Sequence, residues 1–307
     1  MSVTVSALFY SPIKSARGTR LSCEGDSLQV TKRGFKYDRR WLVVRGNMFV
    51  SQRQGSLPIP LPSVVKKALT PLGLGIEARS MCQVAPRIDT DAGQIIIHAP
   101  GMDELRLPLD GVFGSEELVT VWLDRKLGAI DQGKEASEWF TKFLSRERPG
   151  NYRLMRMSYN CQRSSKGGSA LQGFHDGFPF MMISEASLVG LNKRLREKGK
   201  PIVPIDRFRP NILFNGDAHE EDSLKRIRIG DVVFEGRTLC ERCVVTCTDQ
   251  QSAEREKEPL ATLAEYRRGK ILGIKDKPNA VFFGRNFDHQ NEGVIRVGDE
   301  IEVLKID

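Results

Sequence analysis

Short apolar runs separated by turn residues fill the first part of the chain and constrain its fold strongly. Val3, Val5, Ala7 and Phe9 occupy alternate positions before Ser11-Pro12, which is the period of a half-buried strand. Apolar runs on both sides of Gly46-Asn47 predict a β-hairpin. Further strands are expected at 95–98, 105–109 and 118–123. Residues 1–125 are therefore predicted to form a small antiparallel β-barrel-like domain.

A helical pattern then interrupts these strands. Apolar residues recur at the i, i+3, i+4, i+7 and i+8 positions of one face, namely Ala136, Trp139, Phe140, Phe143 and Leu144. The charged stretch before Pro149-Gly150 ends this pattern. We expect residues 126–150 to contain a linking helix and residues 151–307 to form a second domain.

The second half mixes helices and strands. Ser184 is a favourable N-cap for a helix that stops at Gly199. Another helix is expected from Pro259 to Arg268. The sequence at 227–233 is echoed at 295–301, and both copies predict a hairpin around a Gly-Asp turn. Two such hairpins suit a closed or half-closed barrel. The predicted fold class is mixed α+β and β-rich, with a C-terminal β-barrel domain and flanking helices.

Charge and hydropathy exclude several classes of protein. The net charge is +8, but the 47 basic and 39 acidic residues are interleaved, so we expect no nucleic-acid partner. No apolar stretch approaches the roughly 20 residues of a membrane-spanning helix, and the first residues lack the pattern of a signal peptide. We therefore expect a cytoplasmic protein without membrane contact, with its six cysteines as reduced thiols.

The densest chemical signal is a cluster of three cysteines, Cys240, Cys243 and Cys247. A structural zinc site would need about four ligands, and a redox pair would favour a strand-to-helix junction. A third interpretation is one functional thiolate favoured by the adjacent Arg242. Buried cysteines that only pack as small apolar side chains are equally compatible with the spacing. The spacing alone leaves these interpretations open.

Other polar residues are weaker candidates for a site. Lys14-Ser15 follows the first predicted strand, and a lysine, a hydroxyl and loop amides can hold a phosphate. Arg39 and Arg209 precede apolar runs, although an arginine more often forms a surface ion pair. His175-Asp176 resembles part of a hydrolase triad, but the chain has no Gly-x-Ser-x-Gly motif.

Eight motifs in order give the chain a resemblance to a known family. They are Pro-Ile-Lys-Ser at 12–15, Asp-Arg-x-Trp at 38–41, Ser-Glu-Ala-Ser-Leu at 184–188, Arg-Phe-Arg-Pro-Asn at 207–211, Cys-x-Arg-Cys-x-x-Thr at 240–246, Lys-Glu-Pro-Leu-x-Thr-Leu at 257–263, Phe-Gly-x-Asn at 283–286 and Gly-x-Ile-x-Val-Gly-Asp at 293–299. The chain resembles the MOSC family with its N-terminal β-barrel domain. Within that family it is most similar to the mitochondrial amidoxime-reducing components and their bacterial homologues.

The resemblance implies a molybdenum-molybdopterin cofactor between two β-rich domains. The second cysteine of Cys-x-Arg-Cys, here Cys243, would be the protein ligand to the metal and part of the catalytic centre. Contacts to the pterin and its phosphate would fall on Lys14, Ser15, Arg39, Arg209 and Arg242. Asp176 and Asn286 match positions on the metal side of the pocket, and Asp176 is our candidate proton donor. Neither zinc nor pyridoxal phosphate is expected.

The resemblance also implies an activity, which is reduction of N-hydroxylated compounds such as amidoximes, hydroxylamines and N-hydroxy bases. We expect no appended ferredoxin domain, because the sequence has no set of four clustered cysteines to hold its iron–sulfur centre. Electrons would therefore come from a separate flavodoxin, ferredoxin or b5-type haem protein with its reductase. The alternative is a cofactor or sulfur carrier that uses Cys243 as acceptor without turnover of its own.

Overall fold

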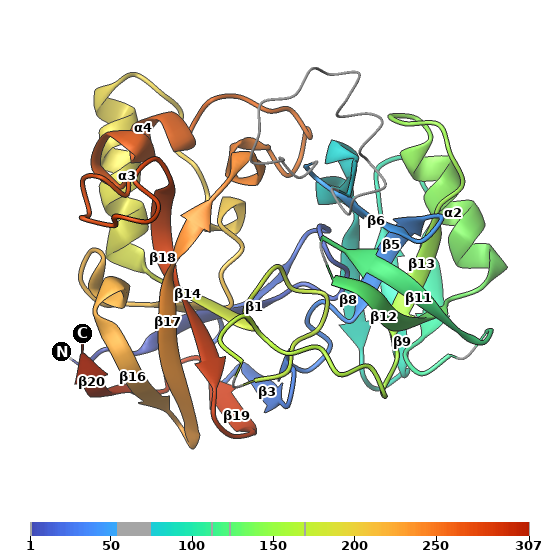
Figure 1. Cartoon of the computed structure of the whole chain (residues 1–307), viewed down its shortest axis with the longest axis horizontal. Coiled ribbons are helices and arrows are strands. Elements are labelled where there is room, and N and C mark those ends of the chain that lie inside the picture. Colours follow the sequence, from blue (N-terminus) through green and yellow to red (C-terminus); the bar gives the residue numbers. More distant parts are fainter. Residues whose placement is uncertain (1, 54–74, 112, 123, 169, 307) are drawn as a thin grey trace.

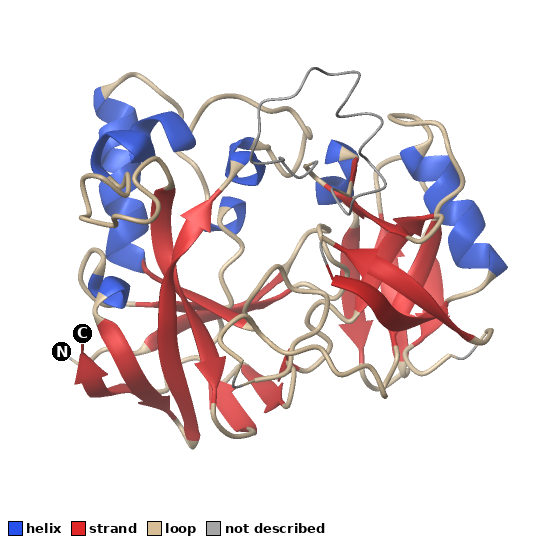
Figure 2. Ribbon diagram, viewed as in Figure 1, coloured by secondary structure: helices blue, strands red, loops and turns tan. Residues whose placement is uncertain are grey.

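The computed structural model describes residues 2–53, 75–111, 113–122, 124–168 and 170–306. Two strand-rich parts lie side by side along the long axis of the molecule, and the longer helices lie at its two ends (Figures 1 and 2). Among the described helices, none has the length and apolar character needed to cross a bilayer.

One part is a closed five-stranded barrel with a helix beside it. Its strands follow the order β11-β12-β13-β5-β6, and a pairing between β11 and β6 closes the ring. Their bounds are β5 Trp41–Arg45, β6 Met48–Ser51, β11 Glu116–Val121, β12 Asp124–Asp131 and β13 Arg153–Met157. Helix α2 (Lys134–Leu144) buries Trp139 and Phe140 against the barrel core. The short β7 (Ile76–Glu77) pairs with β6 in parallel. Strands β8 (Ala85–Asp89), β9 (Gln94–His98) and β10 (Leu105–Pro108) form a separate sheet.

The other part is an eight-stranded sheet with helices on one face. Its order is β2-β1-β15-β14-β18-β17-β16-β20. The bounds are β1 Val5–Tyr10, β2 Thr19–Leu21, β14 Phe180–Ser184, β15 Ile212–Phe214, β16 Leu224–Ile229, β17 Val232–Arg242, β18 Val281–His289 and β20 Ile301–Ile306. Helices α3 (Glu185–Glu197) and α4 (Leu260–Tyr266) cover this face and share a core with Ile183 and Phe283. A small sheet of β19 (Gly293–Arg296), β3 (Ser27–Thr31) and β4 (Gly34–Phe35) completes this part.

The predicted fold class is confirmed, and so are the elements that local sequence determines. The hairpin around Gly46-Asn47 is β5–β6. Ser184 caps α3, because its hydroxyl accepts a hydrogen bond from the Ser187 amide at 3.2 Å. Gly199 follows the helix with a φ of 64°, a left-handed conformation that suits glycine.

The sequence predicted which segments form strands better than it predicted which strands pair with each other. The Gly-Asp turn at 230–231 joins the paired β16 and β17, but the second predicted hairpin is wrong. There β19 pairs with β3, while β20 pairs with β16. A period of two predicts a strand but leaves its partner undetermined.

Sheet membership also crosses the ranges predicted for the domains. Strand β1 lies in the second-half sheet beside β15, and β13 lies in the barrel beside β5. The segment 126–150 contains most of β12 as well as α2. The ranges 1–125, 126–150 and 151–307 stay a prediction about folding units.

Candidate functional site

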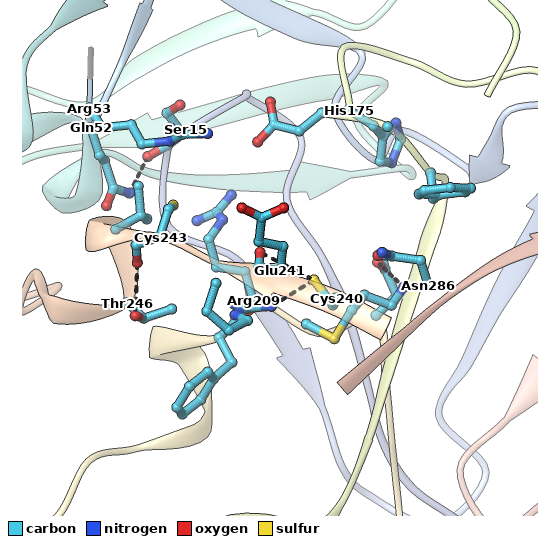
Figure 3. A pocket seen from close by; sticks show the side chains of 18 of the residues that line it. Ser15, Gln52, Arg53, His175, Arg209, Cys240, Glu241, Cys243, Thr246 and Asn286 are labelled. Atoms are coloured by element: carbon cyan, nitrogen blue, oxygen red, sulfur yellow. Dashed lines mark hydrogen bonds between the residues drawn. The ribbon is translucent and has the colours of Figure 1, made fainter. Parts of the chain in front are cut away.

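A cavity of about 570 Å³ lies where the barrel meets the eight-stranded sheet. Its walls include the end of β6, the loop after β1, the C-terminal half of β17 and one residue of β18. All eight residues predicted for the site line it, namely Lys14, Ser15, Arg39, Asp176, Arg209, Arg242, Cys243 and Asn286. Figure 3 shows Cys240, Cys243 and Arg209 on one side of this space, with Ser15 and His175 across from them. Residues far apart in the sequence thus converge on one place.

Two of the three clustered cysteines line the cavity. Cys240 lies near the end of β17, and Cys243 follows that strand. Cys247 is buried instead, its thiol is 3.4 Å from the Lys257 carbonyl oxygen, and burial raises its pKa. Cys247 therefore packs as a small buried side chain, which matches the interpretation of the spacing in which a cysteine has only a packing role.

The guanidinium of Arg242 contacts Cys240 and not Cys243, its neighbour in the sequence. Its Nη1 donates to Cys240 Sγ at 3.0 Å, and its Nη2 donates to the Phe208 carbonyl at 2.6 Å. The adjacency of Arg242 to Cys243 in sequence does not bring the guanidinium to that sulfur, because residues next to each other on an extended chain point to opposite sides. No other described residue hydrogen-bonds the Cys243 thiol, so it is available to a ligand in the cavity, whereas the Cys240 thiol is already hydrogen-bonded.

Lys14 and Asp176 form an ion pair at the cavity wall. The Lys14 side chain is buried, and its Nζ contacts Asp176 Oδ1 and donates to the Phe174 carbonyl at 2.8 Å. Burial lowers the pKa of Lys14 to about 8, although the Asp176 charge opposes this. Asp176 also accepts a hydrogen bond from Trp122 Nε1 at 2.7 Å.

This pair argues against Asp176 as the proton donor that we expected. Surrounding protein atoms disfavour the charged carboxylate, but the ammonium charge and hydrogen bond of Lys14 hold its pKa well below the usual range. Asp176 is therefore ionised at neutral pH and has no proton to give. Lys14, with a pKa of about 8, is the protonated member of the pair.

A buried carboxylate, Asp38, binds Arg39 and several neighbouring groups beside the cavity. It has no exposed surface and accepts hydrogen bonds from the Ser11 amide at 2.6 Å, Arg39 Nη1 at 2.7 Å and Asn211 Nδ2 at 2.8 Å. His175 Nε2 lies 3.1 Å away. Burial disfavours the charged form of Asp38, but these partners hold its pKa below the usual range. Sequence reasoning missed this residue, and its only signal was its place in the Asp-Arg-x-Trp motif.

Three residues of the cavity hold a backbone conformation that side chains rarely adopt. Ser15, Arg39 and Arg209 have φ values of 68°, 48° and 56°. A left-handed conformation in a residue other than glycine is unfavourable, and such residues concentrate at functional sites. Their gathering around one cavity supports a binding role for it.

The cavity is strongly cationic. Its described lining has eight lysine and arginine side chains against two carboxylates, Asp176 and Glu241. Burial lowers the pKa of Arg209 to about 10, so the side chain stays charged at neutral pH. Its Nη1 donates to the Ala16 carbonyl at 2.5 Å, but its buried Nη2 has no partner among the described residues. Buried donors left unpaired are costly, so the cavity fits a large anionic ligand.

The titration of Lys14 gives a testable pH dependence. We expect the affinity of the cavity for sulfate, a dianion throughout this range, to fall as the pH rises through about 8, because Lys14 then loses its charge. Calorimetric titration between pH 6.5 and 9.5 measures this. Asp176→Asn removes the charge that supports the ammonium form, so it should move the fall to lower pH. A Lys14→Gln variant that keeps the same pH profile would contradict the assignment.

Comparison with known proteins agrees with the motifs. A MOSC domain model matches residues 172–302, and a MOSC N-terminal beta barrel domain model matches residues 2–60. Mitochondrial amidoxime reducing component 2 of Rattus norvegicus is 30% identical to the chain, with 97% of this chain and 82% of the relative covered. The Bos taurus protein of that name is 29% identical over the same shares. Mitochondrial amidoxime-reducing component 1 of Homo sapiens is 28% identical, with 98% and 83% covered.

Proposed function

The chain belongs to the MOSC family, and from this premise we propose that it is a molybdenum-cofactor-dependent reductase of N-hydroxylated compounds. The observation that carries the proposal is the convergence of Cys243 and the seven other predicted residues on one cationic cavity. The names of the relatives, which describe amidoxime reduction, support the class of substrate.

The cavity has the donors that a molybdopterin cofactor needs. Its phosphate and dithiolate are anionic, and Lys14, Arg39, Arg209 and Arg242 bring four cations from separate segments. The Arg209 Nη2 and the Arg242 Nε are both buried without a partner among the described residues. Charge-assisted hydrogen bonds to phosphate are the strong kind, so these groups would hold the anionic parts of the cofactor. Ser15 and Asn286 would add uncharged contacts.

Cys243 is the residue that would bind the metal. Thiolate is a soft ligand and suits a metal already held by sulfur. The backbone at this position is fixed, because the Cys243 carbonyl accepts hydrogen bonds from the Thr246 amide at 3.1 Å and the Thr246 hydroxyl at 3.0 Å. Cys240, held by Arg242, would lie beside the ligand and tune its surroundings.

The reaction requires two electrons and two protons for each N–OH group that becomes N–H and releases water. When bound, the cofactor supplies the two-electron chemistry. Lys14 is the cavity group suited to hold a proton at neutral pH, because its pKa is about 8 and Asp176 keeps its Nζ in place. Asp176 would therefore act by positioning Lys14 and not as the acid.

Electrons would reach the site from a separate protein, which we propose to be a flavodoxin, a ferredoxin or a b5-type haem protein. The net charge of +8 favours an acidic partner. A cytoplasmic location stays a prediction, since the relatives in the comparison have names that place them in mitochondria.

The proposal is tested by an assay of benzamidoxime reduction with a reduced viologen dye as donor. Protein made in cells that produce the cofactor should release benzamidine, and Arg209→Gln should lower the rate because one cation is lost from the cavity. A protein that contains molybdenum but reduces none of a panel of amidoximes, hydroxylamines and N-hydroxy bases would contradict the enzyme. That result would favour the carrier that uses Cys243 as acceptor.

A further inference from the structure

A second cavity, of about 440 Å³, lies beside the loop that carries Arg39. Its lining includes Arg40, which follows Arg39, and residues from the β3–β4 turn and from the end of β13. Arg39 lines the first cavity and Arg40 lines the second. Two consecutive residues of one loop therefore line two separate cavities. Nothing in the proposed reaction uses the second cavity.

Three arginines gather around one tyrosine in this cavity. The guanidinium carbons of Arg40 and Arg156 lie 5.7 Å and 5.0 Å from the centroid of the Tyr159 ring. Arg33 Nη2 donates to the Tyr159 carbonyl oxygen at 3.1 Å. Burial lowers the pKa of Arg40 to about 10, and the like charges of Arg33 and Arg156 add to this effect. The three cations are therefore close enough to repel one another.

Two carboxylates, Asp110 and Glu292, also line the cavity, and they compensate these charges poorly. Asp110 Oδ1 is 3.9 Å from Arg156 Nη1, and the Asp110 side chain is 77% exposed while that of Arg156 is only 3% exposed. Solvent screens such a pair strongly. Within the described parts of the chain no salt bridge joins Arg40 to a carboxylate, and the buried Nε atoms of Arg33 and Arg156 have no hydrogen-bond partner. The cavity thus keeps spare positive charge and buried donors.

Aromatic side chains form another part of the wall. Tyr37 and Tyr159 both line the cavity, and the Lys36 ammonium lies 5.3 Å from the centroid of the Tyr37 ring. Trp41 also lines the cavity, with its ring centroid 6.3 Å from that of Tyr37. Such walls favour a flat ring, which packs against aromatic faces and edges. Arginines next to them favour an oxyanion on the same ligand.

We propose that this second cavity binds a small aromatic oxyanion, a carboxylate or phosphate carried on a single flat ring. The oxyanion accepts hydrogen bonds from Arg40 and Arg156, and the ring packs against Tyr37 and Tyr159. The site does not depend on the proposed reductase activity. Its volume suits a small molecule, since ligand pockets begin at roughly 300 Å³.

Titration calorimetry with phenyl phosphate, benzoate and inorganic phosphate tests this site. Phenyl phosphate or benzoate should bind, and the tighter of the two identifies the oxyanion. Inorganic phosphate should bind more weakly because it lacks the ring. Arg40→Gln should weaken binding about tenfold or more, as expected for a lost hydrogen bond to a charged group. Lys36→Gln should also weaken binding, and because the position is exposed, this substitution should leave the fold intact.

Two matched substitutions separate this site from other cationic surfaces. Arg196→Gln makes the same chemical change on the exposed surface of α3 and should leave the affinity unchanged. Arg209→Gln alters the first cavity and should also leave it unchanged. No binding by either aromatic anion would overturn the proposal, and so would binding that Arg40→Gln and Lys36→Gln leave intact. Equal affinity for inorganic phosphate and phenyl phosphate would overturn its aromatic part.

Discussion

Replacing Cys243 by serine is expected to abolish reduction of benzamidoxime, with a loss in rate of more than about 100-fold. Losing a residue that only supports a metal ligand already costs about 10–100-fold, and this substitution removes the ligand itself. The cations of the cavity stay in place, so the pterin should remain bound while the metal is lost. Rate measurements with the viologen donor, together with pterin fluorescence after denaturation, distinguish loss of the metal from loss of the whole cofactor.

The neighbouring cysteines provide the controls for this prediction. Cys247→Ser changes a buried thiol outside the cavity lining and should leave the rate within a few-fold of the parent protein. Cys240→Ser changes a thiol that lines the cavity and accepts a hydrogen bond from Arg242, so a partial loss is expected. Full activity in Cys243→Ser together with no activity in Cys240→Ser would transfer the role of ligand to Cys240.

Asp38→Ala is expected to lower the free energy of unfolding by about 3–5 kcal/mol, the usual cost of breaking a buried ion pair from one side. The substitution leaves Arg39 without its carboxylate and removes the acceptor for Asn211 and for the Ser11 amide. Denaturant unfolding measures the loss. Asp276→Ala, at an exposed position, should change stability by less than about 0.5 kcal/mol. A loss below about 1 kcal/mol for Asp38→Ala would contradict this account of Asp38.

The pH dependence of this loss has a definite sign. The partners of Asp38 hold its pKa in the folded protein below the value of 3.8 for a free aspartate. The charged form therefore stabilises the fold above that value, and the contribution is lost as the pH falls below it. The difference in unfolding free energy between the parent protein and Asp38→Asn should be constant near neutral pH and shrink below about pH 4. A difference that grows on acidification would contradict the assignment.

Local sequence determined some of the fold and left the pairing of distant strands open. The turn residues Gly46-Asn47 and the N-cap Ser184 act on neighbours in the chain, and the structure has both features. The position of β1 beside β15 depends on residues about 200 positions apart in sequence, and a period of two contains no such information. The same limit explains why the echoed sequence at 295–301 forms two strands with different partners.

The site was predictable as a set of residues but not as a network of contacts. The ordered motifs named the residues from Lys14 to Asn286 that line the first cavity. They did not reveal that Arg242 contacts Cys240, that Lys14 forms an ion pair with Asp176, or that Asp38 is fully buried. An aspartate beside an arginine has the sequence pattern of a surface ion pair, and only burial distinguishes Asp38 from one. The second cavity had no sequence signal because its residues come from separate turns and strands.

The most direct test of the central claim is the molybdenum content of the purified chain. Protein produced in cells that make the cofactor is analysed by mass spectrometry for metals, alongside the Cys243→Ser variant prepared in parallel. We expect about one molybdenum per chain in the parent protein and almost none in the variant. Absence of molybdenum from the parent protein in several such hosts, or equal content in both proteins, would contradict the assignment of Cys243 as the metal ligand.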